Sequence, residues 1–224
     1  MVTSRAKVLN LTFHGIGERP NGEHEDEASI WLSVEQFNFV LDFIKGRQDI
    51  FITFDDGNKS DVEIALPLLL KRGIKAAFFV CPGNFGSSGY LTGEDVHSLS
   101  RAGMIIGSHG MHHRDWRQLK NEELMGDLRV SREILEKETE QPISYVACPG
   151  GSYDRRVLNY LKKAGYERVY TSDTGYSRPD AFLQARNTIH SNINPDLLRR
   201  IIEQRTWNSA GFIRVVKKCI KRWC

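Results

Sequence analysis

Short apolar runs alternate along the chain with longer amphipathic stretches. The short runs are rich in β-branched and aromatic residues, which is typical of strands, whereas the longer stretches repeat apolar residues every three or four positions, as helices do. A strand followed repeatedly by a helix indicates parallel strands with helices outside, in an open sheet or a closed barrel. The predicted strands are Val8–Phe13, Ile50–Phe54, Ala76–Val80, Met104–Gly107, Ile143–Ala147 and Arg168–Thr171.

Start and stop signals bound the predicted helices. Ser33 and Gln36 have the spacing of a capping box, which predicts a helix that runs through Lys45. Pro67 lies inside the helical stretch 61–72, so we expect that helix to start late or to kink. The other predicted helices run from Thr92 to Ala102, from Asn121 to about Glu140, and up to a stop at Gly165.

Composition fits a globular protein of one domain. The chain has 224 residues, of which 40% are hydrophobic and 26% charged, and no low-complexity linker divides it. The stretch 15–30 is long, charged and glycine-rich, and a loop of that length usually shapes a site or is mobile. The net charge is +3, but five basic residues near the C-terminus outweigh it. The rest of the chain is therefore slightly acidic, which argues against a nucleic-acid-binding protein.

The cysteines and apolar runs suggest a location. Four cysteines show no paired spacing, so we expect reduced thiols. No apolar run reaches the length of a signal peptide or a membrane span, which predicts a cytoplasmic protein. Residues 212–224 have the pattern of a basic amphipathic helix. That tail either packs on the rest of the protein or makes a weak contact with an anionic membrane surface, which would make the protein peripheral to the membrane.

Two polar constellations carry candidate chemistry. Asp55 and Asp56 end a buried strand just before Gly57, where adjacent side chains diverge and can hold different roles. His109 and His113 are four residues apart, so a helical turn would bring both imidazoles to one side. Two imidazoles and one carboxylate form a three-ligand zinc site with an open position. The alternatives are an ordinary Asp-Gly turn and a structural histidine pair.

A third constellation follows another strand. Pro149, Gly150 and Gly151 can expose backbone N–H groups, as an oxyanion hole requires, although a plain turn has the same composition. Cys148 precedes them, but no flanking pattern supports a nucleophile, so a buried thiol is the better interpretation.

Together these motifs resemble those of the polysaccharide deacetylases, carbohydrate esterase family 4. The resemblance rests on Thr53-Phe-Asp-Asp-Gly57, on the His109-x-x-x-His113 pair and on the later strand that ends at Pro149, and it extends from Val8 to about Arg205. It implies an α/β fold, an irregular (β/α)7 barrel in a single domain over residues 1–211. It also implies hydrolysis of N-acetyl groups on a glycan that contains an acetamido sugar, either a polysaccharide or a lipid-linked glycan.

The resemblance assigns roles to individual residues. Asp56, His109 and His113 would bind Zn²⁺ or another divalent transition metal, and Asp55 would be the general base. Pro149, Gly150 and Tyr153 would lie at the oxyanion and substrate positions. Three features depart from the usual pattern: Ala147 stands where an arginine supports the base, Gly150 stands where a tyrosine supplies a backbone N–H, and the late leucine-x-histidine that supplies the acid has no convincing match.

The catalytic acid has two candidates. His14, in Leu11-Thr-Phe-His14, resembles the N-terminal Tyr-His strand of family members that act on exopolysaccharides, where an early histidine takes the acid role. His190 is the nearest match to the usual late motif. The glycines after His14 leave room for a substrate, whereas a helix-entry sequence follows His190, so we predict His14 as the acid and Asp173 as the residue that orients it.

Two other functional classes share some of these features. A two-His-one-carboxylate iron oxygenase has the same ligand set, but usually on an all-β fold. A carbohydrate-binding protein derived from an esterase would explain the missing arginine, although binding alone does not need Asp55.

Overall fold

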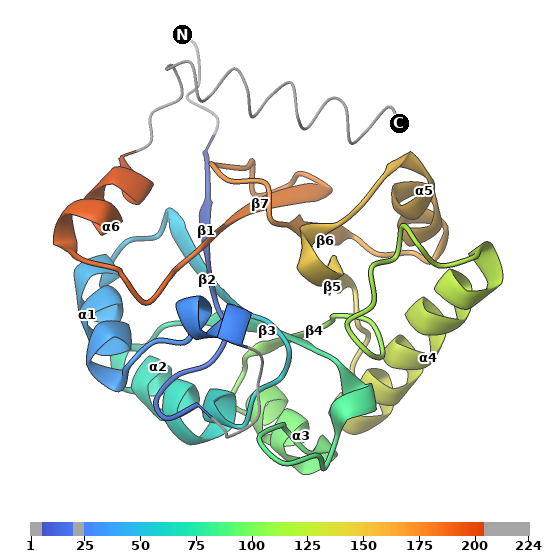
Figure 1. Cartoon of the computed structure of the whole chain (residues 1–224), viewed down its shortest axis with the longest axis horizontal. Helices are drawn as coiled ribbons and strands as arrows, with labels where there is room; N and C mark the ends of the chain where they lie inside the picture. The colour runs from blue at the N-terminus through green and yellow to red at the C-terminus, as the bar shows by residue number, and fades with distance from the viewer. Residues whose placement is uncertain (1–5, 20–24, 204–224) are drawn as a thin grey trace, which may run out of the picture.

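The computed structural model describes residues 6–19 and 25–203 and shows a closed barrel of parallel strands (Figure 1). Strands pair in chain order from β1 to β7, and β7 pairs with β1 to close the barrel. This confirms the predicted single-domain α/β barrel. The strands are β1 (Leu9–Phe13), β2 (Ile50–Phe54), β3 (Ala76–Val80), β4 (Ile105–Ser108), β5 (Tyr145–Ala147), β6 (Arg168–Thr171) and β7 (Leu183–Thr188).

Helices surround the barrel (Figure 1). The α-helices are α1 (Val34–Ile44), α2 (Leu66–Arg72), α3 (Gly93–Arg101), α4 (Asn121–Thr139), α5 (Arg155–Lys163) and α6 (Pro195–Ile202). Shorter turns are the 3₁₀ segments η1 (Glu25–Ile30), η3 (Pro82–Asn84) and η4 (Pro149–Gly151), and the π-helical turn η2 (Asp61–Ala65). In the part of the chain that the structure describes, no helix combines the length and the apolar character needed to cross a membrane.

The local signals act as the sequence predicts. Ser33 caps α1 in a capping box with Gln36, and Thr92 caps α3. Pro67 occupies the first turn of α2, where its missing N–H costs nothing, and the turn before it is π-helical. The tail predicted over residues 212–224 lies outside the described residues.

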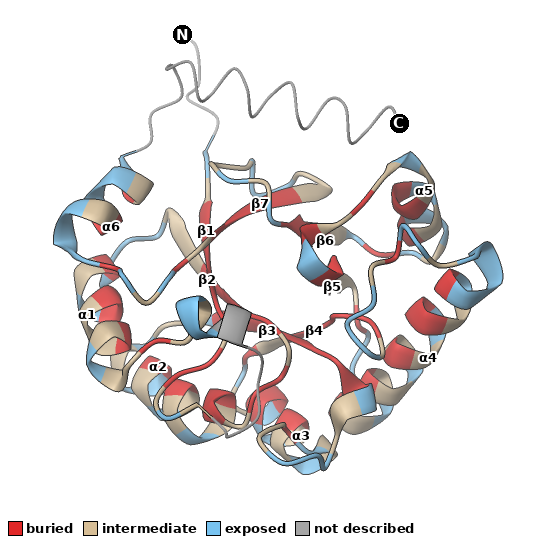
Figure 2. Cartoon of the chain, viewed as in Figure 1, coloured by how far each residue is buried: buried red, intermediate tan, exposed pale blue. Residues whose placement is uncertain are grey.

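Side chains alternate between two apolar layers along the strands. Phe54 and Phe78 point outward and stack at 4.6 Å between ring centroids, in the large core under the helices. Phe79 points inward and packs with Ala147 and Tyr170 in a smaller cluster. Buried residues accordingly concentrate on the strands and on the helix faces that cover them (Figure 2).

The seventh strand, β7, is the one that the sequence pattern missed. Its side chains Gln184 and Arg186 are buried, yet both are polar. Gln184 accepts a hydrogen bond from Asn10 of β1, so polar pairing replaces apolar packing there. A strand whose buried positions are polar carries no hydrophobic signal.

Candidate active site

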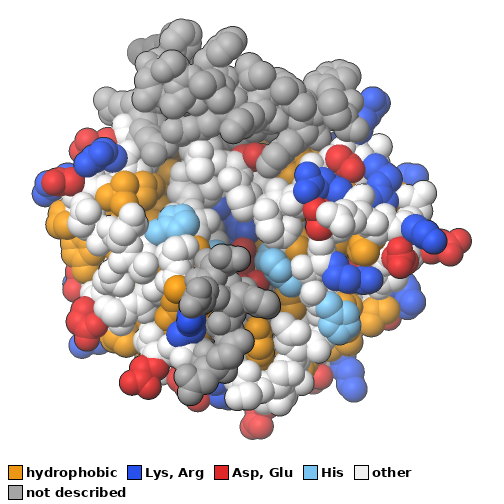
Figure 3. Space-filling view, in the orientation of Figure 1, with side chains coloured by type: hydrophobic (Ala, Val, Ile, Leu, Met, Phe, Trp, Pro, Cys, Tyr) orange, Lys and Arg blue, Asp and Glu red, His pale blue; other side chains and the backbone are white. Residues whose placement is uncertain are grey.

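The chemistry-bearing side chains meet at the carboxyl ends of the strands. Figure 3 looks into that mouth, where acidic, basic and histidine side chains gather around a central hollow. In barrels of parallel strands this rim is where active sites lie, because several strands deliver side chains to one place.

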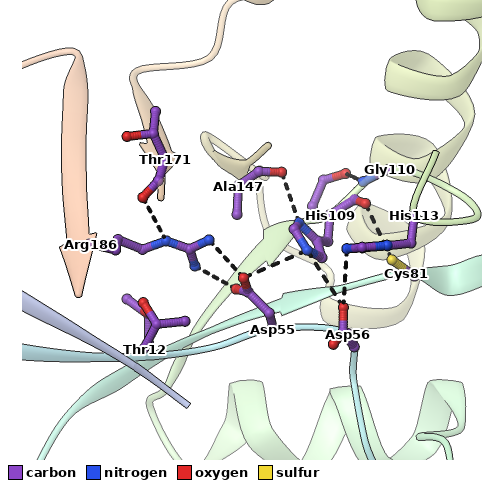
Figure 4. A network of polar contacts seen from close by, with 12 residues as sticks. Thr12, Asp55, Asp56, Cys81, His109, Gly110, His113, Ala147, Thr171 and Arg186 are labelled. Carbon is purple, nitrogen blue, oxygen red and sulfur yellow. Dashed lines mark hydrogen bonds and ion pairs between the residues drawn. The ribbon is translucent and has the colours of Figure 1, made fainter. Parts of the chain in front are cut away.

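The two adjacent aspartates at the end of β2 share one partner and differ in the other (Figure 4). Asp55 contacts Arg186 and lies 3.6 Å from Nε2 of His109, whereas an oxygen of Asp56 lies 3.6 Å from Nε2 of both His109 and His113. The backbone makes this possible, because Asp56 and Gly57 adopt left-handed conformations with φ of 75° and 77°. Such a conformation is strained for aspartate, and strain of this kind clusters at functional sites.

Asp56, His109 and His113 form a compact cluster of donor atoms. One donor atom from each residue can be chosen so that all three lie within 4.8 Å of one another. The expected helical turn between the histidines is wrong: residues 109–113 form a loop after β4, in which Gly110 and His113 have φ of 74° and 52°. The imidazoles still meet, with ring centroids 4.9 Å apart, because two left-handed residues reverse the chain.

A hydrogen bond fixes the orientation and the tautomer of the His109 ring. Its Nδ1 lies 2.9 Å from the carbonyl oxygen of Ala147, to which it donates, so Nε2 keeps its lone pair and faces Asp56. Burial lowers the pKa of His109 to about 3, which keeps the ring neutral. A neutral imidazole beside a second imidazole and a carboxylate is a donor set that fits Zn²⁺.

A buried carboxylate shapes the loop that carries both histidines. Asp127 of α4 accepts hydrogen bonds from the indole N–H of Trp116 at 3.0 Å, from the backbone N–H of Met111 at 3.3 Å and from Arg114 at 3.2 Å. A Cβ on Gly110 would lie 2.7 Å from an Asp127 oxygen, so only glycine fits between them. Asp127 is a positioning residue that the sequence analysis did not single out.

Arg186 is the second residue that the sequence analysis missed. Its guanidinium donates to both oxygens of Asp55, at 2.5 and 2.7 Å, and it lies over the ring of Phe79. Burial opposes the charge on Asp55, but Arg186, His109 and His14 outweigh it and hold the pKa of Asp55 well below its usual range. The family pattern has an arginine at the position of Ala147. In this chain an arginine of β7, Arg186, contacts Asp55 instead. Because the sequence pattern did not predict β7, it gave no indication that Arg186 contacts Asp55.

His14 and His190 follow neighbouring strands, since β1 pairs with β7 and Thr12 is level with Thr188. His14 is half-buried, and its charge would act on Asp55. Its Nδ1 is buried and has no hydrogen-bond partner among the described residues. His190 is exposed to solvent.

The third constellation lies after β5. The backbone N–H groups of Gly151 and Ser152 donate to Cys148 and Pro149, which fixes the turn around Gly150. Tyr153 is buried and donates from its hydroxyl to Asp173, which also accepts from Thr171. An orienting role of Asp173 toward His14 stays a prediction. Cys148 is buried, as expected for a structural thiol.

A comparison with known families gives the assignment. Residues 44–169, more than half of the chain, match the family model described as polysaccharide deacetylase. The chain belongs to the polysaccharide deacetylase family. The matched segment contains Asp55, Asp56, His109 and His113, whereas His14 and Arg186 lie outside it.

Individual relatives agree with this family. The chain is 26% identical over 140 residues to the putative polysaccharide deacetylase YxkH of Bacillus subtilis, over 62% of this chain and 50% of that protein. It is 29% identical over 128 residues to the peptidoglycan-N-acetylmuramic acid deacetylase PdaA of the same organism, over 56% and 47%. The chain therefore spans about half the length of these curated relatives. The Streptococcus pyogenes deacetylase PplD, solved in complex with acetate, shares the fold, with a TM-score of 0.80, 22% identity and coverage of 89% of this chain and 100% of that one.

Proposed function

We propose that this polysaccharide deacetylase is a metal-dependent hydrolase that removes N-acetyl groups from an amino sugar in a polysaccharide or a lipid-linked glycan. The observation that carries the proposal is the pair of adjacent aspartates. Asp56 forms a cluster of donor atoms with two imidazoles, and Asp55 lies beside this cluster with a lowered pKa that keeps it charged. Pure carbohydrate binding needs neither feature.

Asp56, His109 and His113 would hold the metal, with zinc as the best fit to two imidazoles and a carboxylate. Such an ion supplies Lewis-acid polarisation of a carbonyl oxygen and makes water more acidic. The half-exposed His113 leaves the cluster open on the solvent side, where a substrate can approach.

The protein's own groups would move the protons. Asp55 accepts a proton from the water that attacks the acetamido carbonyl carbon, and Arg186 holds the carboxylate in place. The C–N bond then breaks, and His14 gives a proton to the leaving amine. The products are acetate and a free amino sugar. The backbone at Gly150 would donate to the oxyanion, next to the buried Pro149 and Tyr153.

Acetate release from a panel of N-acetylated oligosaccharides tests this function. With metal content measured on every sample, wild-type protein releases acetate. Asp55→Asn keeps the metal and loses about 10²–10⁴-fold in kcat, the usual contribution of a general base. The matched control Asp180→Asn, an exposed aspartate, keeps the wild-type rate. Glycan binding without acetate release by the metal-loaded protein would instead indicate a binding protein.

Two histidine variants test which residue is the catalytic acid. His14→Ala keeps the metal and lowers turnover severely, whereas His190→Ala has a much smaller effect. The reverse ranking would transfer the acid role to His190.

A further inference from the structure

A groove of 730 Å³ is formed by the segments that follow β1 and β2. One wall contains Ile16, two residues after His14, so their Cα atoms lie within about 7 Å of each other. The groove is also lined by Lys59, three residues after Asp56 and within about 11 Å of it. The groove therefore lies at the same rim of the barrel as His14 and Asp56.

Backbone hydrogen bonds build the groove in advance. The N–H of Ile16 donates to the hydroxyl of Ser60 at 3.2 Å, which ties the two walls together. The backbone N–H of Gly17 donates a hydrogen bond to the carbonyl oxygen of Leu32 at 2.8 Å, which attaches this segment to the residues that precede α1. A groove whose walls are already joined loses little conformational entropy when it binds a ligand.

Trp31 provides an aromatic platform in this groove. Its indole N–H donates to the carbonyl of Gly17 at 3.0 Å, and it is half-buried. A Cβ on Gly15 would lie 2.1 Å from the indole ring, so the ring rests on the backbone directly after His14. Trp31 also lines the groove. A rigid ring of this size offers an apolar face on which the C–H face of a pyranose can pack.

The charged groups that line the groove are mainly acidic. Among the described lining residues, Glu18, Glu35 and Glu63 carry carboxylates, and all three are exposed. Lys59 also lines the groove, but its ammonium is paired with Asp95 at 2.7 Å. The groove thus favours a cation, and the cation that deacetylation creates is the ammonium group of a freed amino sugar.

We propose that this groove is a subsite for a neighbouring sugar unit that has already lost its acetyl group. Trp31 stacks on that sugar, and Glu63 and Glu35 attract its ammonium group. The subsite rests on the proposed function, and it adds a preference for partly deacetylated chains over fully acetylated ones. An enzyme with such a site continues along a glycan from units that it has already converted.

The first test compares kcat/KM for acetate release from N-acetylglucosamine pentamers and dimers, β-1,4- and β-1,6-linked. Trp31→Ala lowers the pentamer-to-dimer ratio about tenfold, the equivalent of one aromatic contact, whereas Trp31→Phe retains most of it. Glu63→Gln lowers the preference for a partly deacetylated pentamer about threefold, and added salt lowers the wild-type preference in the same way. The control Glu122→Gln, exposed at the start of α4, changes neither ratio.

The second test is calorimetric binding of a fully deacetylated glucosamine pentamer, which does not depend on turnover. Wild-type protein binds it, and Trp31→Ala binds it about tenfold more weakly. Unchanged ratios in the variants, or no binding to wild type, would overturn the subsite while the proposed function stands. Binding without acetate release from any substrate would overturn the proposed function instead.

Discussion

Two neighbouring aspartates occupy different environments because the backbone turns between them. Asp55 ends the extended strand and keeps 5% of its side chain exposed, while Asp56 is left-handed and keeps 24%. The first carboxylate is enclosed between Arg186 and His109, and the second faces both imidazoles. One dipeptide can therefore supply both a base and a metal ligand.

Replacing Arg186 tests whether the ion pair keeps Asp55 charged. In Arg186→Gln, the positive charge that stabilises the Asp55 carboxylate is lost while the carboxylate remains buried. The pKa of Asp55 therefore rises, and the acidic limb of kcat/KM moves to higher pH. Leaving a buried charge without its partner also costs about 3–5 kcal/mol of stability. pH–rate profiles and urea unfolding measure both effects. The exposed Arg199→Gln is the control, and an unmoved acidic limb in Arg186→Gln would contradict this role.

Replacing Asp127 tests whether the histidine loop is preorganised. Asn offers one acceptor oxygen to three donors, so Asp127→Asn loosens the loop and weakens zinc binding about 10–100-fold, as other outer-shell changes do. Competition with a chelating dye measures the affinity without any turnover. Glu133→Gln lies on the same helix but is exposed, and zinc binding there is unchanged. Equal affinities in the two variants would show that Asp127 serves the fold alone.

At the level of elements, six strands were predicted with bounds within two residues of those observed, and the strand with polar buried positions was not predicted. Ile50–Phe54 and Ala76–Val80 match β2 and β3, because their apolar runs end where the strands end. β7 was missed because its buried groups are polar. Arg186 could not be assigned to Asp55 either, since the two are 131 positions apart and only barrel closure joins them.

We expect an added methyl group to change the free energy of unfolding in opposite directions at two glycines, one in β4 and one in α4. In β4, a Cβ on Gly107 would lie 2.5 Å from the ring of Phe79, so Gly107→Ala overpacks the barrel and costs about 1–3 kcal/mol. In α4, a Cβ on Gly126 meets nothing within 4 Å, and Gly126→Ala raises stability by about 0.5–1 kcal/mol. Urea unfolding of both variants measures these changes. Equal shifts of the same sign would contradict the packing described for the barrel interior.

At the scale of the whole molecule, the closed barrel concentrates acidic groups at one rim. Asp61 is fully buried in η2, near Asp55 and Asp56. Burial, reinforced by the charges on Asp56 and Asp55, raises the pKa of Asp61 well above its ordinary value of 3.8. In the folded protein Asp61 therefore keeps its proton to a higher pH than an ordinary aspartate does, which reduces the negative charge at this rim.

A protonated Asp61 gives the global stability a specific pH dependence. Above the ordinary pKa of 3.8, Asp61 loses its proton in the unfolded chain but keeps it in the folded one. The folded state then binds more protons, so this group lowers the free energy of unfolding as pH rises, until the pH passes the folded pKa. Asn has nearly the same shape and does not titrate. Asp61→Asn should therefore match wild type below pH of about 4 and become more stable than wild type by up to about 1.4 kcal/mol per pH unit above it. Urea unfolding of chelator-treated protein across pH measures the difference, with the exposed Asp196→Asn as control. A difference that stays constant with pH would mean that Asp61 is ionised in the folded protein.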